Sequence, residues 1–232
     1  MNDVPESFLS TSDSSNGFTS SSSTPTVMST GTTVRLLFIV YANQADVYYY
    51  FERSGCALLI KETSKNWQIS EISVEYRNST HKAQYHELQL QLKEESSKFL
   101  ISHLRRENHS LSVSITGAPT RTSEILDNFL ANLVGVNSIT YHLNLSNFQL
   151  IERAILNGTL EALECVHVDE LQDNFLVILK AFFESNSFSH FGVVATHSSV
   201  LAKLSLFETI LARHNLMANW NDDTFVVQRR IC

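Results

Sequence analysis

The chain has 232 residues, of which 43% are hydrophobic, and a formal charge of -7 at pH 7. This length suits one substantial domain with a tail, and the hydrophobic content is typical of a globular protein. Proteins that bind the phosphate backbone of nucleic acids need clustered Lys and Arg. The adjacent basic pairs here are Arg105-Arg106 and Arg229-Arg230, and neither lies in a wider basic run. We therefore expect no nucleic-acid partner.

The cysteines and the apolar runs bear on the compartment. Cys56, Cys165 and Cys232 form no CxxC pair, so the sequence predicts neither a disulfide framework nor a zinc site. This usage is typical of a reducing compartment, and we expect an intracellular protein, cytoplasmic or nuclear. The apolar run 36–40 is too short to span a bilayer, so no membrane partner is expected. One alternative stays open, because a start at Met28 would make this run resemble a cleavable signal.

Composition divides the chain into three parts. Residues 1–33 contain 17 Ser or Thr and few large apolar side chains, too few to offset the entropy of ordering, which predicts a disordered tail. Residues 34–82 are rich in β-branched and aromatic residues, and alternations such as Ile72 and Val74 predict several antiparallel strands. Residues 83–232 are expected to form a βα-repeat domain.

The third part begins with apolar residues at helical spacing, which predict a long amphipathic helix over residues 83–106. These residues are Tyr85, Leu88, Leu92, Phe99, Leu100 and Leu104. Later helix starts are marked by side chains that commonly cap helices, namely Ser146 with Gln149, Asp169 with Gln172, and Ser198.

After this helix the pattern alternates regularly between strands and helices. The expected strand centres Val113, Tyr141, Cys165 and Val193 are 28, 24 and 28 residues apart, and a last strand is expected over 224–227. A strand, a short turn and a covering helix need this spacing, which is also the period of horseshoe-like solenoids. The sequence therefore predicts an α/β fold, a leucine-rich-repeat-like βα repeat with parallel strands.

Motifs for catalysis and cofactor binding are missing. The seven glycines are isolated, so no phosphate-binding loop is present, and neither GxSxG nor HExxH occurs. Cys165, His167 and Asp169 alternate near a strand end, but Cys165 falls at an apolar core position, which favours packing. The doublets Phe182-Phe183 and Phe188/Phe191 could form a binding patch, although their spacing favours the core. We expect no cofactor, no metal and no catalysis. The alternative is a small α/β enzyme whose catalytic residues are scattered over strand ends.

Four local features share an order and spacing with a known family. They are Phe99-Leu100-Ile101 before the strand Leu111–Ile115, the helix Ile125–Leu133 leading to a second strand, the turn Ile155–Glu161, and Phe188–Phe191 before the helix start Ser198–Leu201. In these features the sequence resembles the FTH domain of nematode F-box-associated proteins over somewhat more than half of the chain, although no F-box is recognisable. The resemblance implies protein binding without catalysis, linked to substrate recognition or an adaptor role in ubiquitination.

Strand alternation predicts which side chains are available to a protein partner, because successive residues point to opposite faces of a sheet. Apolar residues are expected against the helices: Leu111, Val113, Ile115, Ile139, Tyr141, Leu143, Leu163 and Cys165. The residues between them are then the candidate binding residues: Ser112, Ser114, Thr116, Thr140, His142, Asn144 and Glu164.

Overall fold

The computed structural model describes residues 32–42, 46–58, 67–77, 88–107, 110–117, 123–142 and 148–230. The tail predicted for residues 1–33 lies outside these ranges, except for Thr32 and Thr33, which begin the first strand. Leu143 and Asn144 lie outside them too. Residues 31–232 form one unit.

A single sheet of eleven strands runs through the described residues of this unit. Its strands are β1 (Thr32–Tyr41), β2 (Val47–Arg53), β3 (Cys56–Leu58), β4 (Trp67–Arg77), β5 (Leu90–Gln91), β6 (Leu111–Thr116), β7 (Val136–His142), β8 (Ala162–Val168), β9 (His190–Ala195), β10 (Leu216–Asn221) and β11 (Thr224–Arg229). The helices are α1 (Glu94–Glu107), α2 (Glu124–Ala131), α3 (Gln149–Leu156), α4 (Asp173–Phe183), α5 (Ser198–Leu204), the 3-10 turn η3 (Ser205–Phe207) and α6 (Glu208–Arg213).

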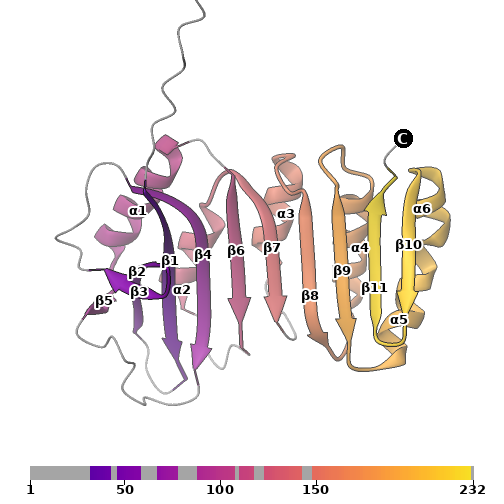
Figure 1. The fold of residues 1–232 in the computed structure, drawn as a ribbon, viewed down its shortest axis with the longest axis horizontal. Helices are drawn as coiled ribbons and strands as arrows, with labels where there is room; N and C mark the ends of the chain where they lie inside the picture. The colour runs from indigo at the N-terminus through magenta and orange to yellow at the C-terminus, as the bar shows by residue number, and fades with distance from the viewer. Residues whose placement is uncertain are drawn as a thin grey trace, which may run out of the picture. The chain divides into compact units, whose positions relative to one another are not determined.

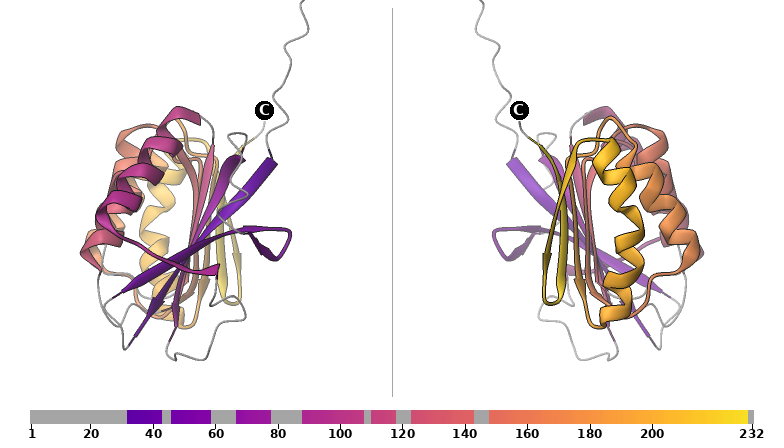
Figure 2. Two further views of the ribbon diagram at one scale, coloured as in Figure 1. Left: turned by 90° about the vertical axis from the view of Figure 1, so that its left-hand side faces the viewer. Right: turned by 90° about the vertical axis from the view of Figure 1, so that its right-hand side faces the viewer.

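The strand order confirms the predicted α/β repeat. The order is β10-β11-β9-β8-β7-β6-β4-β1-β2-β3, with β5 beside β2. From β1 through β4, β6, β7 and β8 to β9, every neighbouring pair is parallel. Helices α1 to α6 lie on one side of this sheet, and Figure 1 looks onto the other side, where no helix of the described ranges lies (Figures 1 and 2). One-sided cover of a parallel sheet is the arrangement of a leucine-rich-repeat-like solenoid.

The β-rich segment is part of the same sheet, and the prediction of several antiparallel strands is correct for β1, β2 and β3 but wrong for β4. β1 and β2 are antiparallel, but β1 and β4 are parallel and β4 continues into β6. Nearly all of β1 is buried from Val34 to Tyr41, on both faces of the strand. Such continuous apolarity is typical of a strand inside a parallel sheet, so β1 indicates parallel pairing more strongly than the short alternations of β4 indicate antiparallel pairing.

The helix predicted over residues 83–106 is shorter, and residues 83–87 of it lie outside the described part. The structure has the short strand β5, which pairs with β2, before α1 begins at Glu94. Leu92 is 3% exposed, and its N–H donates to the Val47 carbonyl at 2.7 Å. Leu88, Leu90 and Leu92 recur at every second residue, which is the period of a strand, and this local pattern overrides the longer helical spacing.

The predicted capping residues Asp169 and Ser198 do not cap helices, and Ser146 lies outside the described residues. The N-cap residues of α3, α4 and α5 are Phe148, Gln172 and His197, and none of them forms a side-chain capping hydrogen bond. The described helix with such a bond is α2, where Ser123 Oγ accepts from Leu126 N at 3.4 Å. Packing of apolar helix faces on the sheet therefore positions these short helices, and caps contribute little.

The end of the repeat contains a strand that the sequence did not predict. β10 pairs antiparallel with β11, and β11 pairs antiparallel with β9, so β11 lies between them. β10 has the sequence Leu-Met-Ala-Asn-Trp-Asn, which holds no β-branched residue and therefore gave no strand signal. The last strand, predicted over residues 224–227, extends to Arg229.

The core lies between the sheet and the helices, as the alternation predicted. The predicted core residues within the described ranges are buried: Leu111, Val113, Ile115, Ile139, Tyr141, Leu163 and Cys165. Phe182, Phe183, Phe188 and Phe191 are buried as well, which confirms their assignment to the core. The ring of Phe183 lies 5.5, 5.3 and 5.4 Å from the rings of Phe188, Phe191 and Phe207, at edge-on angles that aromatic pairs prefer.

Two leucines test this core directly. Leu163 is 0% exposed in β8, whereas Leu156 at the end of α3 is 84% exposed. We predict that Leu163→Ala lowers the free energy of unfolding by about 2–5 kcal/mol, because it leaves a cavity. The matched control Leu156→Ala should change it by no more than about 0.5 kcal/mol. Urea denaturation measures both values, and equal losses in the two variants would show that the register of β8 is wrong.

Candidate functional site

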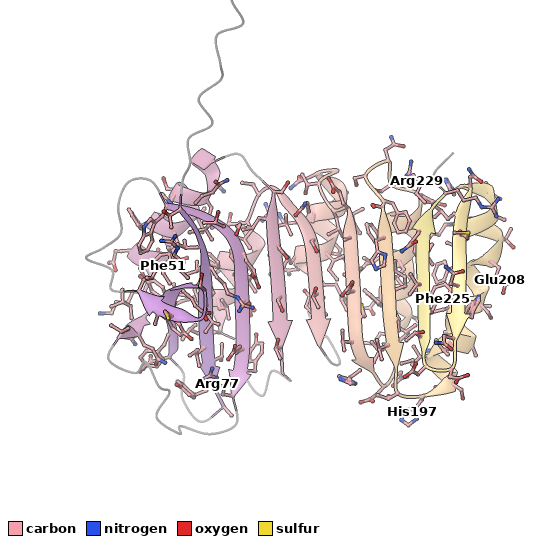
Figure 3. All side chains as sticks on the ribbon, viewed as in Figure 1. Phe51, Arg77, His197, Glu208, Phe225 and Arg229 are labelled. Carbon is pink, nitrogen blue, oxygen red and sulfur yellow. The ribbon has the colours of Figure 1, made fainter. Side chains whose placement is uncertain are left out.

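The face of the sheet opposite the helices is the candidate site, and we call it the open face. Its residues alternate with those of the core along β4, β6, β7, β8, β9 and β11, and neighbouring strands align them in rows. In the central row, Ser73 pairs with Ser114, Ser114 with Thr140, Thr140 with Glu164, and Glu164 with Gly192. Figure 3 shows the side chains of this face in the same view.

Most of the candidate binding residues lie on this face. Ser112, Ser114 and Thr140 are half-buried between neighbouring strands, while Thr116 and Glu164 are exposed. The structure therefore brings these five together on three adjacent strands. His142 is the last residue of β7, but its side chain is not described, and Asn144 lies outside the described residues.

The sequence did not indicate how far the open face extends beyond these strands. Ser73 on β4 and Ser138 on β7 continue the rows of small hydroxyl groups. Ser73 is only 3% exposed, which is low for a polar side chain on an uncovered face. Its neighbour explains this burial, because the Arg35 guanidinium lies across it and Arg35 Nε donates to Ser73 Oγ at 3.0 Å.

Arg35 links three strands at one flank of the open face. Its Nη2 lies 2.7 Å from Glu71 Oε1 on β4, and its Nη1 lies 3.8 Å from Glu52 Oε2 on β2. Nearby, Arg77 pairs with Glu75 on the same strand at 2.5 Å. Ion pairs this accessible stabilise a fold little, since water and salt screen them. These ion pairs nevertheless hold the charged groups of this flank in defined positions.

Beyond Arg35, an apolar cluster covers the same side of the sheet. Leu37, Ile39, Tyr41 and Tyr50 are buried together, and Ala57 of β3 packs against them. The hairpin of β2 and β3 projects on the side of the sheet opposite to the helices (Figure 2). The open face therefore ends at β1.

The other flank contains a histidine beside aliphatic residues. His190 Nε2 lies 3.5 Å from Glu164 Oε1, and its Nδ1 lies 3.4 Å from Gln228 Nε2. Gly192 leaves room for this contact, because a Cβ atom there would lie 3.3 Å from His190 Nε2. Half-buried Val166, Val194 and Val226 and the exposed Met217 continue the face from here, and they form its most apolar part.

The residues considered for nucleophilic chemistry are not arranged for it. Cys165 is 3% exposed, and burial, followed by the charge of Glu164, raises the pKa of its thiol to about 12. It therefore stays protonated at neutral pH, where a thiolate nucleophile is needed. His167 is exposed with a φ of 58° beside a bulge in β8, so it does not share the face of Cys165 in regular alternation.

The carboxyl ends of β8 and β9 carry polar residues, and this is where parallel sheets commonly bind ligands. Here Thr196 Oγ1 donates to the Val168 carbonyl at 3.1 Å and to Asp169 Oδ1 at 2.5 Å. These bonds tie the two strand ends together. Across the described ranges, no group of three or more His, Cys, Asp or Glu is placed to hold a metal ion.

A groove of about 470 Å³ lies on the helix side, between α1 and α2. Its lining includes Lys98, Ile101, Ile125, Asn128 and Asn132. Lys98 is paired there with Glu94 at 2.6 Å, and neither histidine nor cysteine lines the groove. Glu124 also lines the groove, so its polar groups are two carboxylates, two amides, a hydroxyl and one ammonium.

Comparisons with models of protein families, with curated proteins and with solved structures found no match. In the described ranges, no helix is both long enough and apolar enough to cross a bilayer.

The two free cysteines of the described residues should differ strongly in reactivity. Cys56 is exposed, and Cys165 is buried with a raised thiol pKa. In variants that keep one of them and carry Ser at the other cysteines, we predict that native Cys165 reacts with a maleimide at least about a hundredfold more slowly than Cys56. Unfolding in urea should remove the difference. Equal rates in the native protein would place Cys165 at an accessible site and revive the thiol hypothesis.

Proposed function

We propose that this chain is a non-catalytic protein-interaction module that binds a protein on the open face. The observation that carries this proposal is a polar face of parallel strands, from β4 to β9, that no helix covers in the part of the chain that the structure describes (Figure 1). Parallel sheets are nearly always covered on both faces. An uncovered one is characteristic of solenoids, which use that surface to bind partners.

The composition of the face suggests how binding energy is distributed over it. Ser112, Ser114 and Thr140 are short, so the centre offers hydrogen bonds and close backbone approach but little apolar area. Binding energy usually concentrates in large apolar or Arg anchors. Here these lie at the flanks, with Arg35 at one side and Val166, Val194 and Met217 at the other. A suitable partner therefore spans the face and meets both flanks.

The finer parts of the proposal concern the cellular role. From the resemblance to FTH domains, we propose that this chain has a substrate-recognition or adaptor role in ubiquitination, in which the protein bound on the open face is the substrate. The free thiols of Cys56 and Cys165 support a reducing, intracellular site of action, cytoplasmic or nuclear.

A bulky charge in the centre of the open face should block the partner. Thr140 is half-buried at that centre, and Thr209 is exposed on α6 in the opposite layer. We predict that Thr140→Arg lowers recovery of specific partners from cell extract by at least about tenfold, which is about 1.4 kcal/mol. Quantitative mass spectrometry with the full chain as bait measures this.

The matched control is Thr209→Arg, which should leave recovery unchanged. Ser114→Arg and Ser102→Arg repeat the comparison, since Ser114 is half-buried on the open face and Ser102 is exposed on α1. Thermal midpoints near that of the parent would show that the variants fold. Equal partner recovery in all four variants would remove the open face from consideration, and turnover of a metabolite by the purified chain would favour an enzyme.

The ubiquitination role has a separate test. We expect a ubiquitin-ligase adaptor to co-purify with the parent chain and with Thr140→Arg alike, because an adaptor site separate from the open face is needed to deliver a bound substrate. If partners are recovered on the open face but no adaptor is found, the interaction module stands and its link to ubiquitination is wrong.

A further inference from the structure

We propose that β10 is the docking site for an extended peptide of another protein, which adds to the sheet as one more antiparallel strand. This site is the edge of the sheet and does not depend on the open face. In the described part of the chain, β10 has one neighbouring strand, β11, and it is the end of the strand order (Figure 1).

The hydrogen bonds of β11 show which backbone groups of β10 face outward. The Asp223 carbonyl accepts from Ala195 N at 2.7 Å, and Arg229 N donates to the Ser189 carbonyl at 3.3 Å. Odd-numbered residues of β11 therefore use their backbone groups on the β9 side, and even-numbered ones use them on β10. In the register of the two strands, the β10 residues whose backbone groups bond to β11 are Met217, Asn219 and Asn221. Leu216, Ala218 and Trp220 are left with N–H and C=O groups aimed at the edge.

This edge lacks the devices that natural proteins use against strand addition. Exposed edges are usually protected by short length, by Lys or Pro, or by a bulge. β10 has six residues, none of them charged and none of them Pro, and its register with β11 has no shift. At the opposite end of the strand order, β3 has only three residues. Trp220 and Met217 of β10 are each 42% exposed, so large apolar side chains already flank the edge.

A second copy of this chain does not fit at the same edge. α6 packs on β10 itself, in the helix layer seen in the right-hand view of Figure 2. Antiparallel pairing of two β10 edges would place both α6 helices on the same side of the joined sheet. The strands would be about 4.8 Å apart, whereas packed helices need about 8–10 Å between their axes, so the two α6 helices would collide in this arrangement. A single extended peptide carries no helix and meets no such obstacle.

Charges at the two ends of β10 define the peptide further. Arg213, His214 and Arg230 are exposed near the start of the strand, and Asp222 and Asp223 are exposed just after its end. An antiparallel peptide runs from the acidic end to the basic end. It is therefore complementary when it begins with a basic residue and finishes with an acidic one. Between them, apolar side chains belong opposite Leu216, Ala218 and Trp220.

The probe that follows from this register is the peptide Lys-Val-Thr-Val-Thr-Val-Asp with an N-terminal fluorophore. Its valines lie opposite Trp220, Ala218 and Leu216, and its threonines lie on the side of Asn219 and Met217. We expect saturable binding to the full chain by fluorescence anisotropy. We also expect weaker binding of the charge-exchanged peptide Asp-Val-Thr-Val-Thr-Val-Lys.

Two changes remove the central backbone bonds without altering side-chain polarity. Ala218→Pro deletes an N–H that faces the edge, a position where Pro is tolerated in sheets. N-methylation of the central valine of the probe does the same from the peptide side and leaves the protein unchanged. Each should weaken binding by at least about tenfold, a loss of about 1.4 kcal/mol. The thermal midpoint of Ala218→Pro shows whether this variant folds. If it does not fold, the methylated probe tests the same backbone contact on the unchanged protein.

Several outcomes would overturn the proposal. One is the absence of saturable binding at about 1 mM peptide, a concentration that reveals even a weak complex. A methylated probe that binds as well as the parent probe is another. A third is a dimer of the parent chain that becomes a monomer in Ala218→Pro, as measured by analytical ultracentrifugation. This result would show that a second copy of the chain, and not a peptide, occupies the edge of β10. Thr140→Arg should bind the probe normally, so failure of the open-face proposal leaves this result unaffected.

Discussion

Burial of one face of the sheet against one layer of helices is the constraint on which the rest of the structure depends. Each strand from β6 to β9 places its apolar residues, such as Val113, Ile139, Leu163 and Phe191, against that layer. Because side chains alternate, the same pattern fixes the polarity of the opposite face. A one-residue slip in any strand would expose its apolar residues and bury its polar ones. The core therefore holds the open face in register.

The sequence predicted the repeat well because its signal is local. The apolar alternation of Leu111, Val113 and Ile115, for example, needs no knowledge of the neighbouring strands. Pairing across long separations was harder to predict. Arg35, Ser73 and Ser114 lie on neighbouring strands only because β4 enters the sheet between β1 and β6, and no local pattern encodes that order. The same limit explains why the sequence did not indicate Arg35 and His190 as members of the site.

Errors in the local predictions have physical reasons too. Asp169 has the spacing of a capping residue. In the structure, however, its carboxylate accepts a hydrogen bond from the Thr196 hydroxyl and so connects the ends of two strands. Leu88 and Leu92 suit a helix and a strand equally, and the nearby β2 decides between them by offering backbone partners to β5. In both cases a tertiary contact competes with a local preference and prevails.

The order of the last three strands limits how the array can grow. β11 is antiparallel to β9 and separates it from β10, so the unbroken run of parallel neighbours ends at β9, although β10 runs in the same direction as β9. A new βα unit built by duplication could join next to β9 only by separating β9 from β11. Between β6 and β9, by contrast, both neighbours already run parallel, and an inserted unit would find matching surfaces on each side. A longer array would therefore grow most simply in its interior, with the hairpin of β10 and β11 retained as a terminal cap.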